Sequence, residues 1–401
     1  MNYWQKIEEK IQSLINKQEF ISVEWNVISN NRTASRGLIQ ADDSNTELQA
    51  IDKPIYRIYS MTKPVVSMAA IIAIEQGKLS LKDPLTKFLP YFSDAKVQLR
   101  SGSTEQPNRP ISILDLLTHN SGLSYGFNSN CHIGKIYRKE NLIHNSNLPL
   151  EDFVKLIATY PLAFHPGSQW QYSVSTDVLA RVLELLFDQS IDRILSDLIF
   201  KPLGMRDTGY SVMADQNWRL MPIYGEPNLD LVTDKLADRK KLTKIDLSKF
   251  YSQDQKKCSP RGGHGLFSTL ADYTKFCIAI LQDLKSNEKN LVSQQTLKFA
   301  LKNQIPAEQI PISLNGEART GYGWNLIGRV RLQENNEFTK SRFEEFGWAG
   351  AASTYFWIDP NLNSIGVVMT QHLGHSYPLG EKLENICSAI TIMENNKTSL
   401  C

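Results

Sequence analysis

Cysteine is scarce in this chain of 401 residues, which contains only five. They are scattered, odd in number and never arranged as a C-x-x-C pair; they are Cys131, Cys258, Cys277, Cys387 and Cys401. Secreted domains stapled by disulfides carry dense, even-numbered cysteines, and structural zinc sites use closely spaced ligand pairs. The sequence therefore predicts neither a disulfide framework nor a cysteine-based zinc site.

Long apolar runs are also missing. The chain has no run of the roughly 18 apolar residues that a membrane-spanning helix requires. Near the N-terminus, Glu8, Glu9 and Lys10 stand where a signal peptide would need an apolar core. We expect a soluble, cytoplasmic protein, with export by a route that uses no cleaved signal left open.

Positive and negative charges nearly balance in this chain, and the formal net charge is +2. That value gives no reason to expect a nucleic-acid or membrane partner. Hydrophobic residues make up 41% and charged residues 21%, which is ordinary globular composition. We expect a small-molecule substrate as the partner, and the oligomeric state is left open.

Strand patterns occur at both ends of the chain. Residues 20–29 and 35–41 predict one antiparallel pair, and 353–358 with 364–371 predict another, each joined by a turn. Apolar residues at helical spacing occur in 3–16 and again after the last strand. These patterns predict an α+β fold: an antiparallel β-sheet flanked by N- and C-terminal helices, with a mostly helical inserted domain.

The middle of the chain is richer in helical patterns. Apolar residues recur at helical spacing in three segments, 113–119, 151–160 and 176–187. Residues 228–260 are charge-rich and weakly periodic, which predicts a surface loop or a lid. We expect residues 1–80 and 261–401 to form the sheet domain and residues 81–260 to form the inserted helical domain.

Residues 122 to 126, GLSYG, match the G-x-S-x-G turn that exposes the nucleophile of α/β-hydrolases. That turn needs an apolar strand before the serine and a helix after it. Ser124 instead follows LLTHNSGL, a helix end with turn residues, and precedes the loop-like FNSNCHIG. Ser124 is therefore not expected to be the nucleophile.

Ser60 lies in a more ordered setting, IYRIYSMTKPVVSMAAIIAIEQG. Pro64 favours a helix that begins at about Ser60, and Gly77 is a natural stop. The residues between them are apolar nearly all round, which predicts a buried helix. Ser60 and Lys63 then share one face at its N-terminus, and a lysine held against apolar surroundings has a lowered pKa.

With its S-x-x-K pair, the chain resembles the class C β-lactamase, penicillin-binding-protein and serine-esterase superfamily. The second motif appears as Tyr172-Ser173-Val174, and the third, Lys-Thr-Gly in lactamases, as Trp348-Ala349-Gly350. Esterase-type (family VIII-like) members carry Trp-Gly-Gly or a similar form there. Three further stretches look like the family's: LTHNSGL (117–123), IFKPLGMRDTGY (199–210) and RGGHGLFSTLADYTKF (261–276).

The resemblance implies a role for each matching residue. Ser60 would be the acylated nucleophile, and Lys63 and Tyr172 would share the role of base as one proton-transfer unit. Which of the two is the base stays open. The backbone N–H groups of Ser60 and Ala351 would form the oxyanion hole.

The same resemblance gives four substrate-binding candidates: Trp348, Ala349, Gly350 and Val174. Trp348 would form a wall of the acyl pocket, or else be an aromatic core residue of a strand. Lactamases use Lys and Thr where this chain has Trp348 and Ala349, and Asn where it has Val174. Because polar recognition groups that are absent cannot select a polar substrate, uncharged esters or amides are favoured over β-lactams.

Histidines offer no metal site in the sequence. His264, His372 and His375 do not have the spacing of an H-E-x-x-H site, so no metal is predicted, and no cofactor is expected.

The leading hypothesis is a serine esterase or acyltransferase that works through an acyl-enzyme. Within the same fold the alternatives are a β-lactamase, a D-amino-acid peptidase or amidase, and a transesterase. From another class comes a penicillin-binding-type sensor or scaffold that is acylated without turnover.

Overall fold

The computed structural model of the chain describes these residues: 3–41, 51–142, 148–225, 243–245, 259–286, 288–314, 316–332, 342–374 and 377–398. Within them, a seven-stranded sheet has the order β11-β12-β13-β14-β15-β1-β2, and every neighbouring pair is antiparallel. Its strands are β1 Ser22–Ser29, β2 Arg32–Gln40, β11 Tyr322–Trp324, β12 Arg329–Arg331, β13 Phe346–Ala349, β14 Tyr355–Asp359 and β15 Ser364–Met369.

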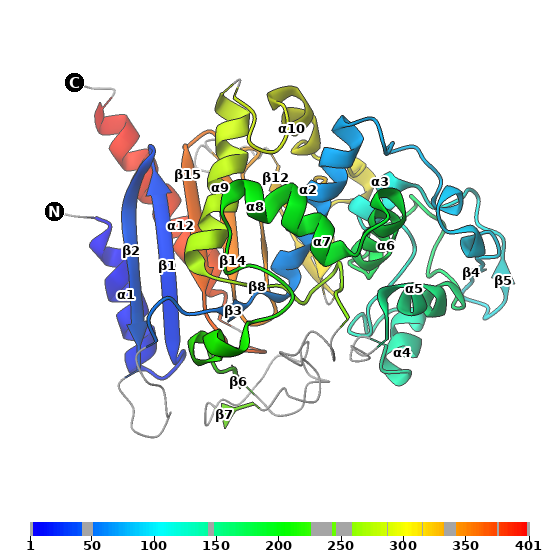
Figure 1. The fold of residues 1–401 in the computed structure, drawn as a ribbon, viewed down its shortest axis with the longest axis horizontal. Helices are drawn as coiled ribbons and strands as arrows, with labels where there is room; N and C mark the ends of the chain where they lie inside the picture. The colour runs from blue at the N-terminus through cyan, green and yellow to red at the C-terminus, as the bar shows by residue number, and fades with distance from the viewer. Residues whose placement is uncertain are drawn as a thin grey trace.

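Strands from the two ends of the chain are neighbours in the sheet, where β15 pairs with β1. β1 pairs with β15 in a register that places Trp25 opposite Val368. Both predicted hairpins are therefore present, β1–β2 and β14–β15, and they are neighbours in one sheet (Figure 1). The predicted antiparallel sheet is confirmed. The two three-residue strands β11 and β12 were not predicted.

The helices are α1 Gln5–Asn16, α2 Thr62–Glu75, α3 Ile113–Leu117, α4 His132–Lys139, α5 Leu150–Ala158, α6 Ser175–Phe187, α7 Ile191–Leu195, α8 Lys201–Leu203, α9 Leu270–Lys285, α10 Gln294–Ala300 and α12 Leu379–Thr398. Shorter helical turns are η1 Tyr59–Met61, η2 Leu85–Lys87, η3 Pro90–Phe92, η4 Ser196–Phe200, η5 Ala214–Arg219 and η7 Ala307–Gln309. Two-stranded pairs are formed by β3 Tyr56–Arg57 with β8 Phe267–Ser268, β4 Val97–Gln98 with β5 Thr104–Glu105, β6 Tyr224–Gly225 with β7 Thr243–Lys244, and β9 Ile312–Leu314 with β10 Glu317–Arg319.

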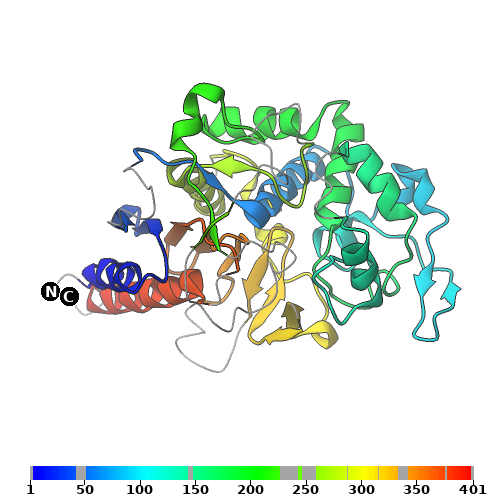
Figure 2. The same ribbon diagram turned by 90° about the horizontal axis from the view of Figure 1, so that it is seen from below.

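The two terminal helices cover one face of the sheet. Figure 2 shows α1 and α12 lying side by side, with both chain ends close together. Ile11 and Leu383 from these helices share an apolar cluster with Trp25 and Trp357 from the strands. The predicted flanking helices are thereby confirmed, because their apolar faces are buried against the sheet.

The opposite face carries α9 and, beyond it, the long apolar helix α2. α9 contacts β15 and β1, and its N-cap residue Thr269 accepts a hydrogen bond from the Asp272 amide at 3.1 Å. In α2, residues 62 to 73 are all buried, which explains why its sequence is apolar nearly all round. α3, α5 and α6 lie further from the sheet and match the three predicted helices (Figure 1).

The predicted domain boundaries and the predicted location in the cell are not decided by the fold. The domain boundaries at 80/81 and 260/261 remain a prediction, and so does a cytoplasmic location. No helix in the described ranges is long and apolar enough to span a bilayer. Of the expected loop or lid 228–260, the structure describes only 243–245 and 259–260; the rest lies outside the described residues.

Cys131, Cys277 and Cys387 are free thiols. Cys258 and Cys401 lie outside the described residues.

Candidate functional site

Ser60 lies where the chain turns from β3 into helix. Tyr59 adopts a left-handed backbone conformation with φ of 45°, which is uncommon for a bulky residue and accumulates at functional sites. η1 then runs directly into α2, so the helix begins at about Ser60, as predicted. The first amides of a helix have no partner within it, so they point toward whatever lies at this end.

Lys63 lies one turn further on and is buried, with 2% of its surface exposed. Its Nζ donates to the carbonyl oxygen of Gly263 at 2.7 Å and to Ser60 Oγ at 3.4 Å. Burial lowers the pKa of Lys63 from its usual value to about 7, against a weaker opposite effect of the Asp177 carboxylate. A substantial fraction of Lys63 is therefore neutral at pH 7 and able to accept a proton.

Tyr172 lies on the other side of Lys63, although it is more than a hundred residues away in the chain. The Lys63 Nζ is 4.7 Å from the centre of the Tyr172 ring. Burial raises the pKa of Tyr172, while hydrogen bonds with Ser60 and Trp348 act in the opposite direction. The phenol is therefore protonated at neutral pH and is linked to both Ser60 and Lys63.

Trp348 lies on β13 and contacts Tyr172 directly. Its indole Nε1 donates a hydrogen bond of 3.0 Å to the Tyr172 hydroxyl, and the two ring centres are 5.1 Å apart. The side chain is 6% exposed and also meets Trp324 edge-on at 4.6 Å. Trp348 is thus buried like a core residue and at the same time touches a predicted site residue, a combination that neither sequence interpretation foresaw.

Near Trp348, the residues Ala349, Gly350 and Ala351 each lie in a different environment. A Cβ at Gly350 would lie 2.5 Å from the carbonyl oxygen of Ile58, so glycine allows this segment to approach the chain just before Ser60. Among the described residues, the backbone amide of Ala351 has no hydrogen-bond acceptor. Ala349 faces the opposite way, toward the apolar cluster under α1 and α12, so its side chain lies away from Tyr172.

Val174 is also removed from any surface that a substrate could touch. It is 1% exposed and belongs to the main apolar core, next to the start of α6. The structure therefore brings together Ser60, Lys63, Tyr172 and Trp348, and it buries the Val174 side chain.

Asp177 and the loop 261–264 were not among the predicted site residues. The Gly263 amide donates to Asp177 Oδ1 at 2.9 Å, while the Gly263 carbonyl accepts from Lys63. A Cβ at Gly263 would lie 2.6 Å from both Asp177 Oδ2 and the Tyr125 hydroxyl, so only glycine fits there without displacement. The double glycine in RGGHG was the available signal for such a close approach.

His119 is a second residue that the sequence did not single out. Its backbone is left-handed, with φ of 59°, and its ring lies 4.7 Å from that of Tyr172. Its Nδ1 lies 3.3 Å from Ser173 Oγ. Burial, helped by the positive charge of Lys63, lowers the pKa of His119 well below its ordinary value, so the imidazole is neutral and serves as packing for Tyr172.

Ser124 is fully buried, with 0% of its surface exposed. Its Oγ accepts hydrogen bonds from Gln171 Nε2 at 2.9 Å and Asn128 Nδ2 at 3.2 Å. The contact with Gln171 joins the GLSYG segment to the chain just before Tyr172, and the contact with Asn128 closes the loop that follows the segment. Ser124 thus lies in a structural loop, as its sequence context predicted.

The histidines form no metal-binding group with other residues in the part of the chain that the structure describes, where no cluster of three His, Cys, Asp or Glu occurs. His264 and His372 are described, and His375 lies outside the described residues.

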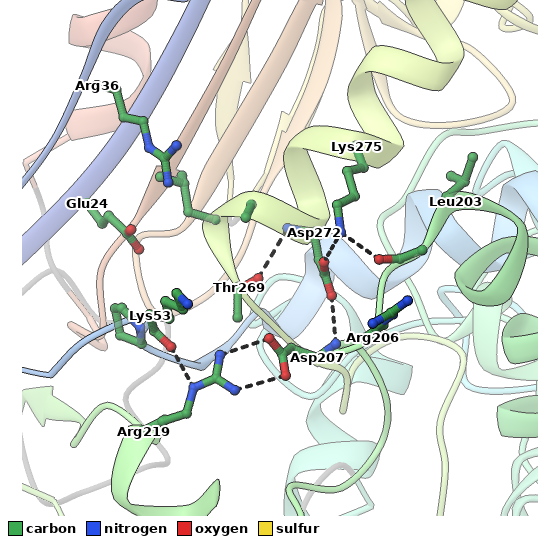
Figure 3. Close-up of a pocket in the computed structure, with 14 residues that line it drawn as sticks. Glu24, Arg36, Lys53, Leu203, Arg206, Asp207, Arg219, Thr269, Asp272 and Lys275 are labelled. Carbon is green, nitrogen blue, oxygen red and sulfur yellow. Dashed lines mark hydrogen bonds and ion pairs between the residues drawn. The ribbon is translucent and has the colours of Figure 1, made fainter.

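A charged pocket of about 450 Å³ lies at the N-terminus of α9, apart from this cluster (Figure 3). Arg219 donates to both carboxylate oxygens of Asp207, at 2.9 and 2.8 Å, and Lys275 lies 2.8 Å from Asp272. These ion pairs join the chain around η5, α8 and α9. Since none of Ser60, Lys63 and Tyr172 lines it, this pocket is not the candidate catalytic site.

An antiparallel sheet flanked by terminal helices, with a helical part between its strands, is the β-lactamase and transpeptidase-like fold. The sequence matches the Beta-lactamase family over residues 7–384. The chain therefore belongs to the Beta-lactamase family, and the resemblance seen in the motifs is confirmed.

Relatives with assigned names include two esterases. Lovastatin esterase of Penicillium rubens is 26% identical over 361 residues, which cover 85% of this chain and 84% of that protein. Esterase EstB of Burkholderia gladioli is 34% identical over 177 residues, which cover 43% of each. Among solved structures, EstCE1, described as a hydrolase with promiscuous acyltransferase activity, aligns with a TM-score of 0.78 at 22% identity, covering 97% of this chain and 98% of that one. This last likeness shows a shared fold.

Proposed function

We propose that this protein is a serine hydrolase that cleaves uncharged carboxylic esters through an acyl-enzyme on Ser60. The observation that carries the proposal is the contact of Ser60, Lys63 and Tyr172 at the start of α2. The names of the esterase relatives support the same chemistry. An alcohol in place of water would make the reaction an acyl transfer, as the description of EstCE1 suggests for that protein.

In the first half-reaction, Ser60 Oγ attacks the ester carbonyl carbon and its proton moves to neutral Lys63. The backbone amides of Ser60 and Ala351 would receive the oxyanion, since Ser60 lies in the turn that leads into α2 and Ala351 packs against the apolar cluster that contains Tyr59. Lys63 is the better base of the two candidates because its pKa is about 7, whereas the pKa of Tyr172 is raised. Tyr172 then donates its own proton to the leaving alkoxide and recovers one from the protonated Lys63, so an alcohol departs.

In the second half-reaction, water attacks the acyl carbonyl and gives its proton to the same pair. The acid leaves and Ser60 recovers its proton, so the enzyme returns to its starting state. The Gly263 carbonyl accepts a hydrogen bond from Lys63 Nζ and holds that amino group close to Ser60, and Asp177 fixes the same residue by accepting from the Gly263 amide.

Trp348 argues against β-lactams as the preferred substrates. The indole N–H is committed to Tyr172, and an indole carries no positive charge for a substrate carboxylate. A charge-assisted hydrogen bond of that kind is worth roughly 1.5–3 kcal/mol, which corresponds to about a tenfold to hundredfold rate difference. A neutral ester does not use that contact.

The experiment compares kcat/KM for 4-nitrophenyl acetate and butyrate with that for a chromogenic cephalosporin. We expect the esters to be turned over repeatedly and the cephalosporin at least about tenfold less efficiently. A single burst of one nitrophenol per protein, without further release, would instead favour the sensor that is acylated without turnover. Equal efficiency on the cephalosporin would favour the β-lactamase alternative.

A further inference from the structure

A second cavity, of about 430 Å³, lies beside the segment that leads into Tyr172. Its walls come from the end of β4, the start of α4, residues 169–171 and the β9–β10 hairpin. The volume is in the range of small-molecule sites, which is roughly 300–1,000 Å³. Ser60, Lys63 and Trp348 do not line it, so it is separate from the catalytic cluster.

Carboxamides are the most frequent polar side chains among the lining residues. The five that line the cavity are Gln98, Asn128, Asn130, Gln169 and Gln171. No Asp or Glu is among the described lining residues, and the two basic ones, Arg100 and His132, are both exposed. Because carboxamides donate and accept hydrogen bonds without charge, this lining suits a neutral, polar ligand.

Two of these carboxamides are held in fixed orientations. Asn128 Nδ2 donates to the Tyr172 carbonyl at 2.9 Å, and Gln171 Nε2 donates to Ser124 Oγ at 2.9 Å. Because these side-chain nitrogens already donate hydrogen bonds, the side-chain oxygens of Asn128 and Gln171 remain as possible acceptors. Neither oxygen accepts a hydrogen bond from a described residue. The wall therefore presents two positioned acceptors.

Two polar atoms of lining residues have no partner among the described residues, the acceptor Gln98 Oε1 and the donor Trp170 Nε1. Both have almost no accessible surface, so they lie behind the cavity wall. The hydrogen-bonding groups of the lining are therefore the other carboxamides, and a hydroxyl group can pair with either end of a carboxamide because it donates and accepts.

We propose that this cavity binds an uncharged, hydroxyl-rich ligand such as a sugar or polyol unit. The carboxamides supply hydrogen bonds to the hydroxyl groups, and the aromatic side chains of Trp170 and Phe164 supply apolar surface for the carbon skeleton. The site is independent of acyl transfer. It touches the catalytic cluster through Asn128, which holds the Tyr172 carbonyl.

The test is a titration of the full chain with methyl α-D-glucopyranoside, followed by saturation-transfer NMR and calorimetry. Gln169→Leu keeps the side-chain size and removes an exposed carboxamide of the lining, so it should weaken binding by at least about tenfold. Asn130→Ala, at an exposed position, provides a second variant whose folding is not in question. Gln282→Leu, an exposed amide on α9, is the matched control and should bind as the unmodified protein does.

Absence of glucoside binding to the unmodified protein, or equal binding by both lining variants and the control, overturns the inference. Tighter binding of inorganic phosphate at the same residues would overturn the assignment of a neutral ligand. Ser60→Ala should abolish ester hydrolysis and retain glucoside binding. A protein that binds the glucoside but hydrolyses no ester would therefore refute the proposed function alone, and the reverse result would refute this inference alone.

Discussion

Lys63 is the residue whose protonation state controls the proposed reaction. Its pKa is lowered to about 7 by burial, well below the ordinary lysine value near 10.4. A base must be neutral to accept the Ser60 proton, and the neutral form predominates only above that pKa. The pH dependence of activity therefore reports on this one side chain.

We predict that kcat/KM for 4-nitrophenyl acetate rises as the pH increases through about 7 and falls about tenfold per pH unit below it. Asp177→Asn removes the carboxylate that raises the pKa of Lys63, so the inflection should move to lower pH. Asp152→Asn, on the exposed side of α5, is the control. An inflection that Asp177→Asn leaves in place, or moves upward, would contradict the assignment of Lys63 as base.

Trp348 acts on the same proton-transfer unit through its N–H group. Trp348→Phe keeps an aromatic ring but removes the donor to Tyr172, and a hydrogen bond is worth about 1 kcal/mol. We predict a fall in kcat of about fivefold with little change in KM, because the contact orients Tyr172 and does not bind substrate.

The control for Trp348→Phe is Trp25→Phe, which loses the hydrogen bond from Nε1 to Ser35 Oγ on the other face of the sheet. It should lower stability without changing kcat. Equal effects of the two substitutions on kcat would show that Trp348 is only a packing residue.

At the scale of elements, a buried charge network fastens α12 to the edge of the sheet. Glu384 from α12 accepts hydrogen bonds from Arg329 at 2.7 Å and Arg342 at 2.6 Å. Burial raises the pKa of Glu384, but the two guanidinium groups outweigh it and hold that pKa well below its usual range. Such a carboxylate stabilises the fold above its unfolded pKa of about 4.3, and that stabilisation is lost as the pH falls further.

We predict that Glu384→Gln lowers the free energy of unfolding by about 3–5 kcal/mol, since it removes one of the two carboxylates that pair with the buried Arg329 and Arg342 and leaves only Glu345. Urea denaturation at pH 7 measures the change. Glu381→Gln, whose partner Arg319 lies 3.6 Å away at the surface, should cost less than about 1 kcal/mol. If the two variants unfold at the same urea concentration, the network does not hold α12 to the sheet.

The elements differ in how well they can be predicted from sequence. β1 and β15 are long enough for their β-branched and aromatic residues to form a clear pattern, and α2 has fourteen residues of nearly uniform apolar character. β11 and β12 have three residues each, too few to show an alternation. β12 is a strand because β13 offers it an edge to pair with, and β11 in turn pairs with β12, which is information from the tertiary structure.

At the scale of the whole molecule, the candidate site combines parts of different predictability. Ser60 and Lys63 are three residues apart in one helix, so their meeting follows from helical geometry alone. Tyr172 and Trp348 come from segments that only the family resemblance connects to Ser60. Asp177 acts through the Gly263 backbone, 86 positions away, and no local pattern marks such a contact.

The third-motif positions show a further limit. Ala349 and Val174 share motifs with residues at the site, yet Ala349 faces the terminal helices and Val174 is in the core. Successive residues of a strand point to opposite faces, so Ala349 on β13 faces away from Trp348. Val174 is not in a strand; it precedes α6 and its side chain is buried with that helix.

The central claim is that the acyl group is carried by Ser60 and not by Ser124. A fluorophosphonate probe followed by peptide mass spectrometry measures this directly, with Ser60→Ala and Ser124→Ala as the paired variants. We predict a label on the peptide that contains Ser60, lost in Ser60→Ala and retained in Ser124→Ala, because Ser60 adjoins Lys63 while Ser124 is fully buried. A label on the Ser124 peptide with Ser60 unmodified would contradict the account.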